Sequence, residues 1–137
     1  MLQLETINNA YSFHSYNEHS AKLIKPQANI LSTQTIEEAL LEISTTSLIY
    51  KNQLINNNLP ATYLQFSQQT IEKLLEYPAD IYLIGTGSKL SFPNKETLRT
   101  IAKNKLPIDF MDTGAACRTF NILTAEYREI AAIIFFD

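Results

Sequence analysis

The sequence predicts an α/β fold, and the C-terminal half of the chain carries the evidence. Three apolar segments, 80–84, 108–111 and 129–136, are separated by stretches whose apolar residues have helical spacing. Strands and helices that alternate in this way imply parallel strands joined by right-handed crossovers. The last segment is apolar on both faces, which is typical of a central strand in a sheet that helices cover on both sides.

Size and composition favour one globular domain over residues 1–137. The chain is 45% hydrophobic and 18% charged, which is the balance of a globular protein rather than a disordered one. Its net charge of −3 argues against a general nucleic-acid binder, which normally presents a basic face. The single cysteine excludes an internal disulfide and is compatible with a reducing compartment.

The sequence also predicts a cytoplasmic location without membrane insertion. No positive side chain precedes Lys22, which disfavours both a secretory signal and a mitochondrial presequence. The longest apolar run, residues 130–136, is far shorter than the roughly 20 residues that span a bilayer.

The first half of the chain has weaker patterns. We expect a β-hairpin, a short helix in which Ile36, Leu40 and Ile43 recur at helical spacing, a brief strand, and a polar turn. In order, these elements are the strands 12–16 and 21–25 around Asn17-Glu18, the helix 34–43, the strand 47–50 and the turn 56–58.

Three helices follow, each with a residue that favours its N-terminus. Ser67 caps a helix through Glu76, before the helix-breaking Pro78; Asn94 caps a second that stops before Pro107. Asp112 or Thr113 caps a third that runs to about Leu123. The expected apolar positions are Ile71, Leu74 and Leu75 in the first helix, and Leu98, Ile101 and Ala102 in the second.

The crossover topology predicts where a binding site lies. In parallel sheets, ligands bind beyond the carboxyl ends of the strands. The turns Gly85-Thr86-Gly87 and Asp112-Thr113-Gly114 follow two strands, and Arg118 and Asn121 share a face of the third helix. We therefore predict one surface crevice formed by Gly85, Thr86, Gly87, Asp112, Thr113, Arg118 and Asn121.

The chemistry of this crevice stays open at the level of the sequence. The dinucleotide fingerprint needs a third glycine where this chain has Leu90, so a structural turn is favoured over a nucleotide loop. The Arg118 guanidinium suits a carboxylate or a phosphate, and an internal ion pair with Asp112, with Glu126 or at the edge of the sheet is the favoured alternative.

No catalytic or metal-binding set accompanies the crevice. Cys117 lies well inside its helix without an evident base, so a small buried side chain is the favoured interpretation. His14, Glu18 and His19 are better explained by an exposed hairpin than by a metal site. We expect no catalytic residue, no metal and no cofactor.

The segments IYLIGTG, FMDTGAACRTFNIL and EYREIAAIIFF closely resemble a family of small bacterial and archaeal proteins of unassigned function, related to mitochondrial respiratory complex I assembly factor 3. The resemblance covers about residues 47–137, whereas the first 45 residues align weakly. Three positions depart from the family pattern: Phe120 replaces a usual tyrosine, Tyr127 replaces a usual glycine, and Leu59 precedes Pro60 where the family often has tryptophan.

The resemblance implies a central, mostly parallel but partly mixed sheet that is flanked by helices. It also implies a non-catalytic assembly factor that acts through protein partners in the maturation of membrane-bound respiratory or other complexes, and it permits a homo-oligomer. The alternative is a small-molecule or nucleotide-binding protein, even an enzyme, that uses the Gly85–Gly87 and Asp112 crevice.

Overall fold

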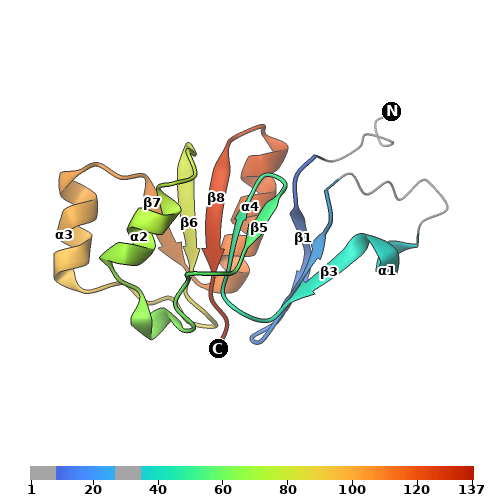
Figure 1. Ribbon diagram of the computed structural model, residues 1–137, viewed down its shortest axis with the longest axis horizontal. Coiled ribbons are helices and arrows are strands. Elements are labelled where there is room, and N and C mark those ends of the chain that lie inside the picture. The colour runs from blue at the N-terminus through green and yellow to red at the C-terminus, as the bar shows by residue number, and fades with distance from the viewer. Residues whose placement is uncertain (1–8, 27–34) are drawn as a thin grey trace.

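The computed structural model describes residues 9–26 and 35–137, which form two sheets and several helices (Figure 1). The elements in chain order are β1 (Ser12–Tyr16), β2 (Ala21–Ile24), α1 (Ile36–Ala39), β3 (Leu40–Ile43), β4 (Ser47–Tyr50), β5 (Gln53–Ile55), the 3₁₀ helix η2 (Tyr63–Gln65), α2 (Gln68–Leu74), β6 (Ile81–Gly85), α3 (Lys95–Lys103), β7 (Ile108–Met111), α4 (Thr113–Ala125) and β8 (Ile130–Ile134).

The larger sheet confirms the predicted α/β fold class and its partly mixed character. Its strand order is β5-β4-β8-β6-β7. Strand β6 pairs in parallel with both β7 and β8, whereas β4 pairs antiparallel with β8 and β5. Every residue of β8 is buried, as its apolar sequence predicts for a strand in the interior of the sheet.

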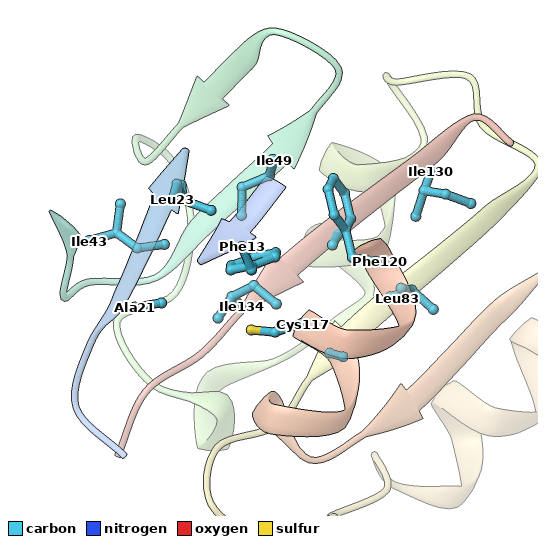
Figure 2. Packing of buried hydrophobic residues seen from close by; sticks show 12 residues of the cluster. Phe13, Ala21, Leu23, Ile43, Ile49, Leu83, Cys117, Phe120, Ile130 and Ile134 are labelled. Atoms are coloured by element: carbon cyan, nitrogen blue, oxygen red, sulfur yellow. The ribbon is translucent and has the colours of Figure 1, made fainter. Parts of the chain in front are cut away.

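Alternate side chains of β8 enter two separate hydrophobic clusters on the two faces of the sheet. Ile130, Ala132 and Ile134 pack in the cluster that contains α4 residues, part of which Figure 2 shows. Ala131 and Ile133 pack in the other cluster, with Ile71 and Leu74 of α2 and Ile101 of α3. The period of two in a strand therefore gives each face of the sheet its own helical layer.

The smaller sheet, of order β1-β2-β3, packs against the α4 side of the larger one. The ring of Phe13 on β1 meets the ring of Phe120 on α4 edge to face, with centroids 5.5 Å apart. Figure 2 shows these two rings together with Leu23 and Ile43 of the smaller sheet. The predicted hairpin is confirmed, because β1 and β2 pair antiparallel.

The helix predicted over residues 34–43 is wrong. Gln34 lies outside the described residues, α1 covers only Ile36–Ala39, and the remaining residues form β3. Leu40 and Ile43 pair with Ile24 and Ala21 of β2, and this pairing buries Ile43. A contact between distant segments has outweighed the local helical spacing.

Other differences are smaller. Leu75, Leu98 and Ala102 are exposed instead of facing the core, and α2 ends at Leu74, two residues before the predicted end. Strand β8 is shorter at both ends than the predicted 129–136, and strand β5 was not predicted.

Helix α4 ends in a Schellman motif, in which Tyr127 occupies the position where glycine is usual. The N–H of Tyr127 donates to the carbonyl of Thr124, and the N–H of Arg128 donates to the carbonyl of Leu123, at 3.0 Å each. Tyr127 has φ of +63° in this turn, a conformation that glycine adopts without steric cost. Its side chain is 96% exposed and so contributes little packing.

Tyr127→Gly should therefore raise the free energy of unfolding by about 1 kcal/mol relative to Tyr127→Ala, because only glycine relieves the left-handed backbone. Urea unfolding of the two variants measures this difference. The alanine variant is the matched control, since it removes the side chain but keeps the Cβ. Equal stability of the two variants would contradict the assignment of strain to Tyr127.

Candidate functional site

The ends of β6, β7 and β8 are joined by one buried hydroxyl, that of Thr113 at the start of α4. This hydroxyl accepts a hydrogen bond from the N–H of Gly87 at 2.9 Å and donates to the carbonyl of Phe135 at 2.7 Å. The N–H of Thr113 donates in turn to the carbonyl of Gly87 at 2.8 Å. Thr113 thus fixes the loop after β6 against the segment after β8.

Close packing requires glycine at position 85, and a positive φ angle requires it at position 87. A Cβ on Gly85 would lie 3.0 Å from the Thr113 hydroxyl oxygen. Gly87 has φ of +106°, and a Cβ there would lie 2.5 Å from a carboxylate oxygen of Asp137. The hydroxyl of Thr86 donates to the carbonyl of Lys89 at 2.6 Å and closes the turn.

The carboxylate of Asp112 is the N-cap of α4. One of its oxygens accepts the N–H of Ala115 at 2.8 Å, as the sequence predicted for a cap at this position.

Beside this cap lies an open cavity of about 300 Å³, at the carboxyl ends of the strands. Three segments line it: the tip of the β1–β2 hairpin, the loop after β6, and the first turns of α4. The lining residues are Tyr16, Asn17, Glu18, Gly87, Ser88, Asp112, Thr113, Gly114 and Arg118.

Arg118 crosses from α4 to the hairpin. Its Nη1 donates to the hydroxyl of Tyr16, and its guanidinium carbon lies 5.9 Å from the centre of the Tyr16 ring. Within residues 9–26 and 35–137 Arg118 forms no ion pair, so the predicted alternative with Asp112 or Glu126 is wrong. Gly114 lies close beside this contact: a Cβ at this position would be 2.8 Å from the Tyr16 ring.

Of the seven predicted crevice residues, the structure brings Gly87, Asp112, Thr113 and Arg118 together around the cavity. Gly85 and Thr86 lie behind its lining and support it. Asn121 serves a different purpose: its side chain accepts the N–H of Phe13 and donates to the carbonyl of Phe13, at 2.8 Å each. It therefore holds β1 against α4.

Sequence reasoning missed the contribution of the hairpin. Tyr16, Asn17 and Glu18 reach the cavity only because the smaller sheet packs on α4, more than 90 residues away along the chain. The one sequence signal was the turn at Asn17-Glu18, which marks a hairpin but not the surface that it covers. Ser88, which directly follows the first predicted turn, was also missed, and Gly114 lines the cavity as the last residue of the second predicted turn.

The backbone N–H groups around the cavity are largely engaged. The N–H of Gly87 donates to the Thr113 hydroxyl, and the N–H of Thr113 donates to the Gly87 carbonyl. The N–H of Ala115 donates to the Asp112 carboxylate, and the N–H of Ser88 donates to the Asp137 carboxylate at 2.9 Å. A phosphate loop works by presenting such groups to the ligand. Polar recognition in this cavity therefore depends mainly on side chains.

Two ionisable groups near the cavity have shifted pKa values. Hydrogen bonds from the Ser88 hydroxyl and N–H lower the pKa of Asp137, with smaller effects of His19 and Lys89. Burial raises the pKa of Cys117 to about 12, so its thiol is protonated near neutral pH. Cys117 is 1% exposed and packs in the α4 cluster, which confirms its interpretation as a small buried side chain.

In the part of the chain that the structure describes, no group of three or more His, Cys, Asp or Glu side chains is arranged to hold a metal ion. Among the same residues, no helix combines the length and the apolar character needed to cross a bilayer.

The fold is shared with small proteins of known structure. A Bordetella parapertussis protein aligns over 95% of this chain and 98% of its own, with a TM-score of 0.72 and 17% identity. A Bordetella pertussis protein described as a Mth938-like domain aligns over 98% of this chain and 91% of its own, with a TM-score of 0.67 and 16% identity. At such identities the likeness concerns the fold alone.

The chain belongs to the family described as protein of unknown function DUF498/DUF598, which matches residues 40–135. Two curated relatives are similar over shorter stretches. A Francisella tularensis "13 kDa major membrane protein" is 39% identical over 64 residues, 47% of this chain and 52% of the relative. A Danio rerio NADH dehydrogenase (ubiquinone) 1 alpha subcomplex assembly factor 3 is 34% identical over 61 residues, 44% of this chain and 35% of the relative. The matches thus span about half and about a third of these relatives.

Thr113→Val should lower the free energy of unfolding by about 2–4 kcal/mol, because it leaves the N–H of Gly87 and the carbonyl of Phe135 without their buried partner. Thr113→Ser keeps the hydroxyl and should lose about 1 kcal/mol or less, the cost of one methyl group. Urea unfolding of both variants makes the comparison. A loss in Thr113→Val that is no larger than that in Thr113→Ser would show that the two hydrogen bonds of the hydroxyl add little stability.

Proposed function

We propose that this chain is a non-catalytic assembly factor that binds protein partners during the maturation of membrane-bound respiratory or other complexes. The observation that carries the proposal is the similarity to an assembly factor, within a family that matches most of the chain. In this proposal the cavity between the hairpin and α4 is the partner-binding surface, and Arg118 and Tyr16 are its exposed polar contacts.

The chemistry of the described residues supports a role without catalysis. Nucleophilic catalysis needs an activated group with a base in reach. The Cys117 thiol is buried with a raised pKa, and the Asp112 carboxylate is committed to capping α4. His14 and His19 lie on the exposed hairpin, where the ring nitrogens contact Ser15 and the carbonyl of Asp137.

Domain organisation and location are part of the same proposal. We propose one domain over residues 1–137, supported by the way β8 enters both core clusters and the smaller sheet enters one of them. We also propose a cytoplasmic location, from which the chain would reach a membrane-bound complex at the membrane surface.

Affinity capture from the native cell tests this proposal. Subunits of a membrane-bound complex should co-purify with the wild-type chain and be lost with Arg118→Glu, because the exposed guanidinium is replaced by a charge of opposite sign at the cavity. Ile122→Ser is the matched control: its side chain is 60% exposed on the same helix and does not line the cavity, so capture should persist. Equal capture by wild type and Arg118→Glu would contradict this surface assignment, and capture without such subunits would contradict the assembly role.

The alternative function is binding of a small anionic molecule, a nucleotide or a carboxylate. The cavity of about 300 Å³ with Arg118 at its margin is the observation that favours it. The occupied N–H groups around Gly87 and Ser88 favour a carboxylate, which Arg118 could bind through both oxygens, over a nucleotide phosphate.

A thermal-shift series with nucleotides and small carboxylates separates the two functions. Under the alternative, one of these compounds raises the melting temperature of wild type by several degrees, because a ligand stabilises the state that it binds. The shift should fall in Arg118→Ala and be partly kept in Arg118→Lys, which retains the charge without the planar fork. Shifts that are the same in wild type and both variants would speak against a site at Arg118.

A further inference from the structure

Positive charge is concentrated in one segment of this acidic chain. Residues 88–105 contain five cations and one acid, a net charge of +4, whereas the whole chain has −3 and the remainder therefore −7. The cations are Lys89, Lys95, Arg99, Lys103 and Lys105, with Glu96 as the acid. None of these cations forms an ion pair within the part of the chain that the structure describes.

Helix α3 arranges three of these cations on one face. Lys95, Arg99 and Lys103 recur every four residues, and all three are exposed. The opposite side of the helix carries Ile101, which packs into the core under the larger sheet. Helix α3 lies at the outer end of the molecule (Figure 1), so its basic face is open to a large partner.

Apolar side chains protrude beside these cations. The loop between β6 and α3 exposes 51% of Leu90 and 60% of Phe92. The hydroxyl of Tyr63 donates to the carbonyl of Ser91 at 2.7 Å and fixes η2 beside this loop. The next residue of η2, Leu64, is 95% exposed. Three large apolar side chains therefore face solvent on two segments that are tied together.

Hydrogen bonds and a ring contact fix the conformation of this loop, so its apolar side chains have defined positions. The hydroxyl of Thr86 bonds both the carbonyl of Lys89 and the N–H of Ser91. The ring of Phe92 contacts that of Phe110 with centroids 6.3 Å apart. Apolar side chains that face water cost free energy, which is regained when an apolar partner covers them. An ordered loop that exposes such side chains is therefore suited to binding an apolar partner.

We propose that the exposed side chains of residues 88–105, together with Leu64, form a peripheral docking surface for an anionic lipid bilayer. Leu64, Leu90 and Phe92 enter the headgroup boundary, while Lys89, Lys95 and Arg99 contact anionic headgroups. Apolar side chains flanked by cations are the combination that binds at a lipid interface. A nucleic acid would use the cations but would leave the two leucines without a role. This inference does not depend on the proposed assembly function.

A fluorescent reporter is available because the chain contains no tryptophan. Leu90→Trp and Phe92→Trp each place a single tryptophan on the surface, and Tyr127→Trp places one at the end of α4 as a control. With vesicles of equal parts phosphatidylcholine and phosphatidylglycerol, emission of the first two variants should shift to shorter wavelength and that of Tyr127→Trp should not. Leu90→Trp stays informative if loss of the Phe92 ring perturbs folding, since Leu90 makes no ring contact of this kind.

Co-sedimentation with the same vesicles measures affinity. Leu90→Ser should weaken binding by about tenfold, because it removes one apolar anchor. The double variant Lys95→Glu/Arg99→Glu should weaken it by about tenfold or more, and added salt should act in the same direction. Ile122→Ser, an exposed apolar residue outside the surface, should bind as wild type. Vesicles of phosphatidylcholine alone should bind weakly.

Several outcomes would overturn the proposal. No shift of either reporter, or vesicle binding unchanged by both the serine and the glutamate variants, excludes this surface as the lipid contact. Concentration-dependent dimers that Leu90→Ser abolishes, without vesicle binding, would assign the surface to a second copy of the chain. Binding to acidic proteins or nucleic acid but not to vesicles would also refute the lipid assignment.

Discussion

Burial of helix α4 between two sheets is the constraint on which the rest of this structure depends. One side of the helix packs Ala116, Cys117 and Phe120 into a cluster with the central strands, and the same cluster takes in the smaller sheet. Asn121 adds two hydrogen bonds to the backbone of Phe13. Because the helix is fixed on both sides, its first turn is held where three strands of the larger sheet end. The cavity exists only because this turn and the hairpin are both anchored to α4.

The residues around the cavity therefore serve mainly to hold the fold together. Thr113, Gly85 and Gly87 are specified by packing and hydrogen bonding, and Asp112 is specified by its cap. The exposed polar side chains that remain for recognition are Arg118 and Tyr16 at the margin, with Asn17 and Glu18 on the hairpin. This rigid frame is the basis on which we propose the cavity as a partner-binding surface.

The C-terminal half could be predicted because its signals are local. The caps at Asn94 and Asp112 and the apolar run of β8 each specify one element, and crossover topology then brings the strand ends together. The prediction of the first half was wrong where an element depends on contacts between segments that are distant in the sequence. Strand β3 forms by pairing with β2, which no spacing within residues 34–43 reveals. Likewise the sequence singled out Asn121 as a candidate for the crevice, whereas docking of β1 directs it to the backbone.

Strand β7 leaves one border of the larger sheet without a further neighbour in the part of the chain that the structure describes. Open borders can recruit a strand from another molecule and so lead to aggregation. Here the border is only four residues long, Pro107 before it has no N–H to offer, and Asp109 places an exposed charge in its middle. These features disfavour sheet extension between molecules along β7, so any contact that another molecule makes at this border is left to side chains rather than to the backbone.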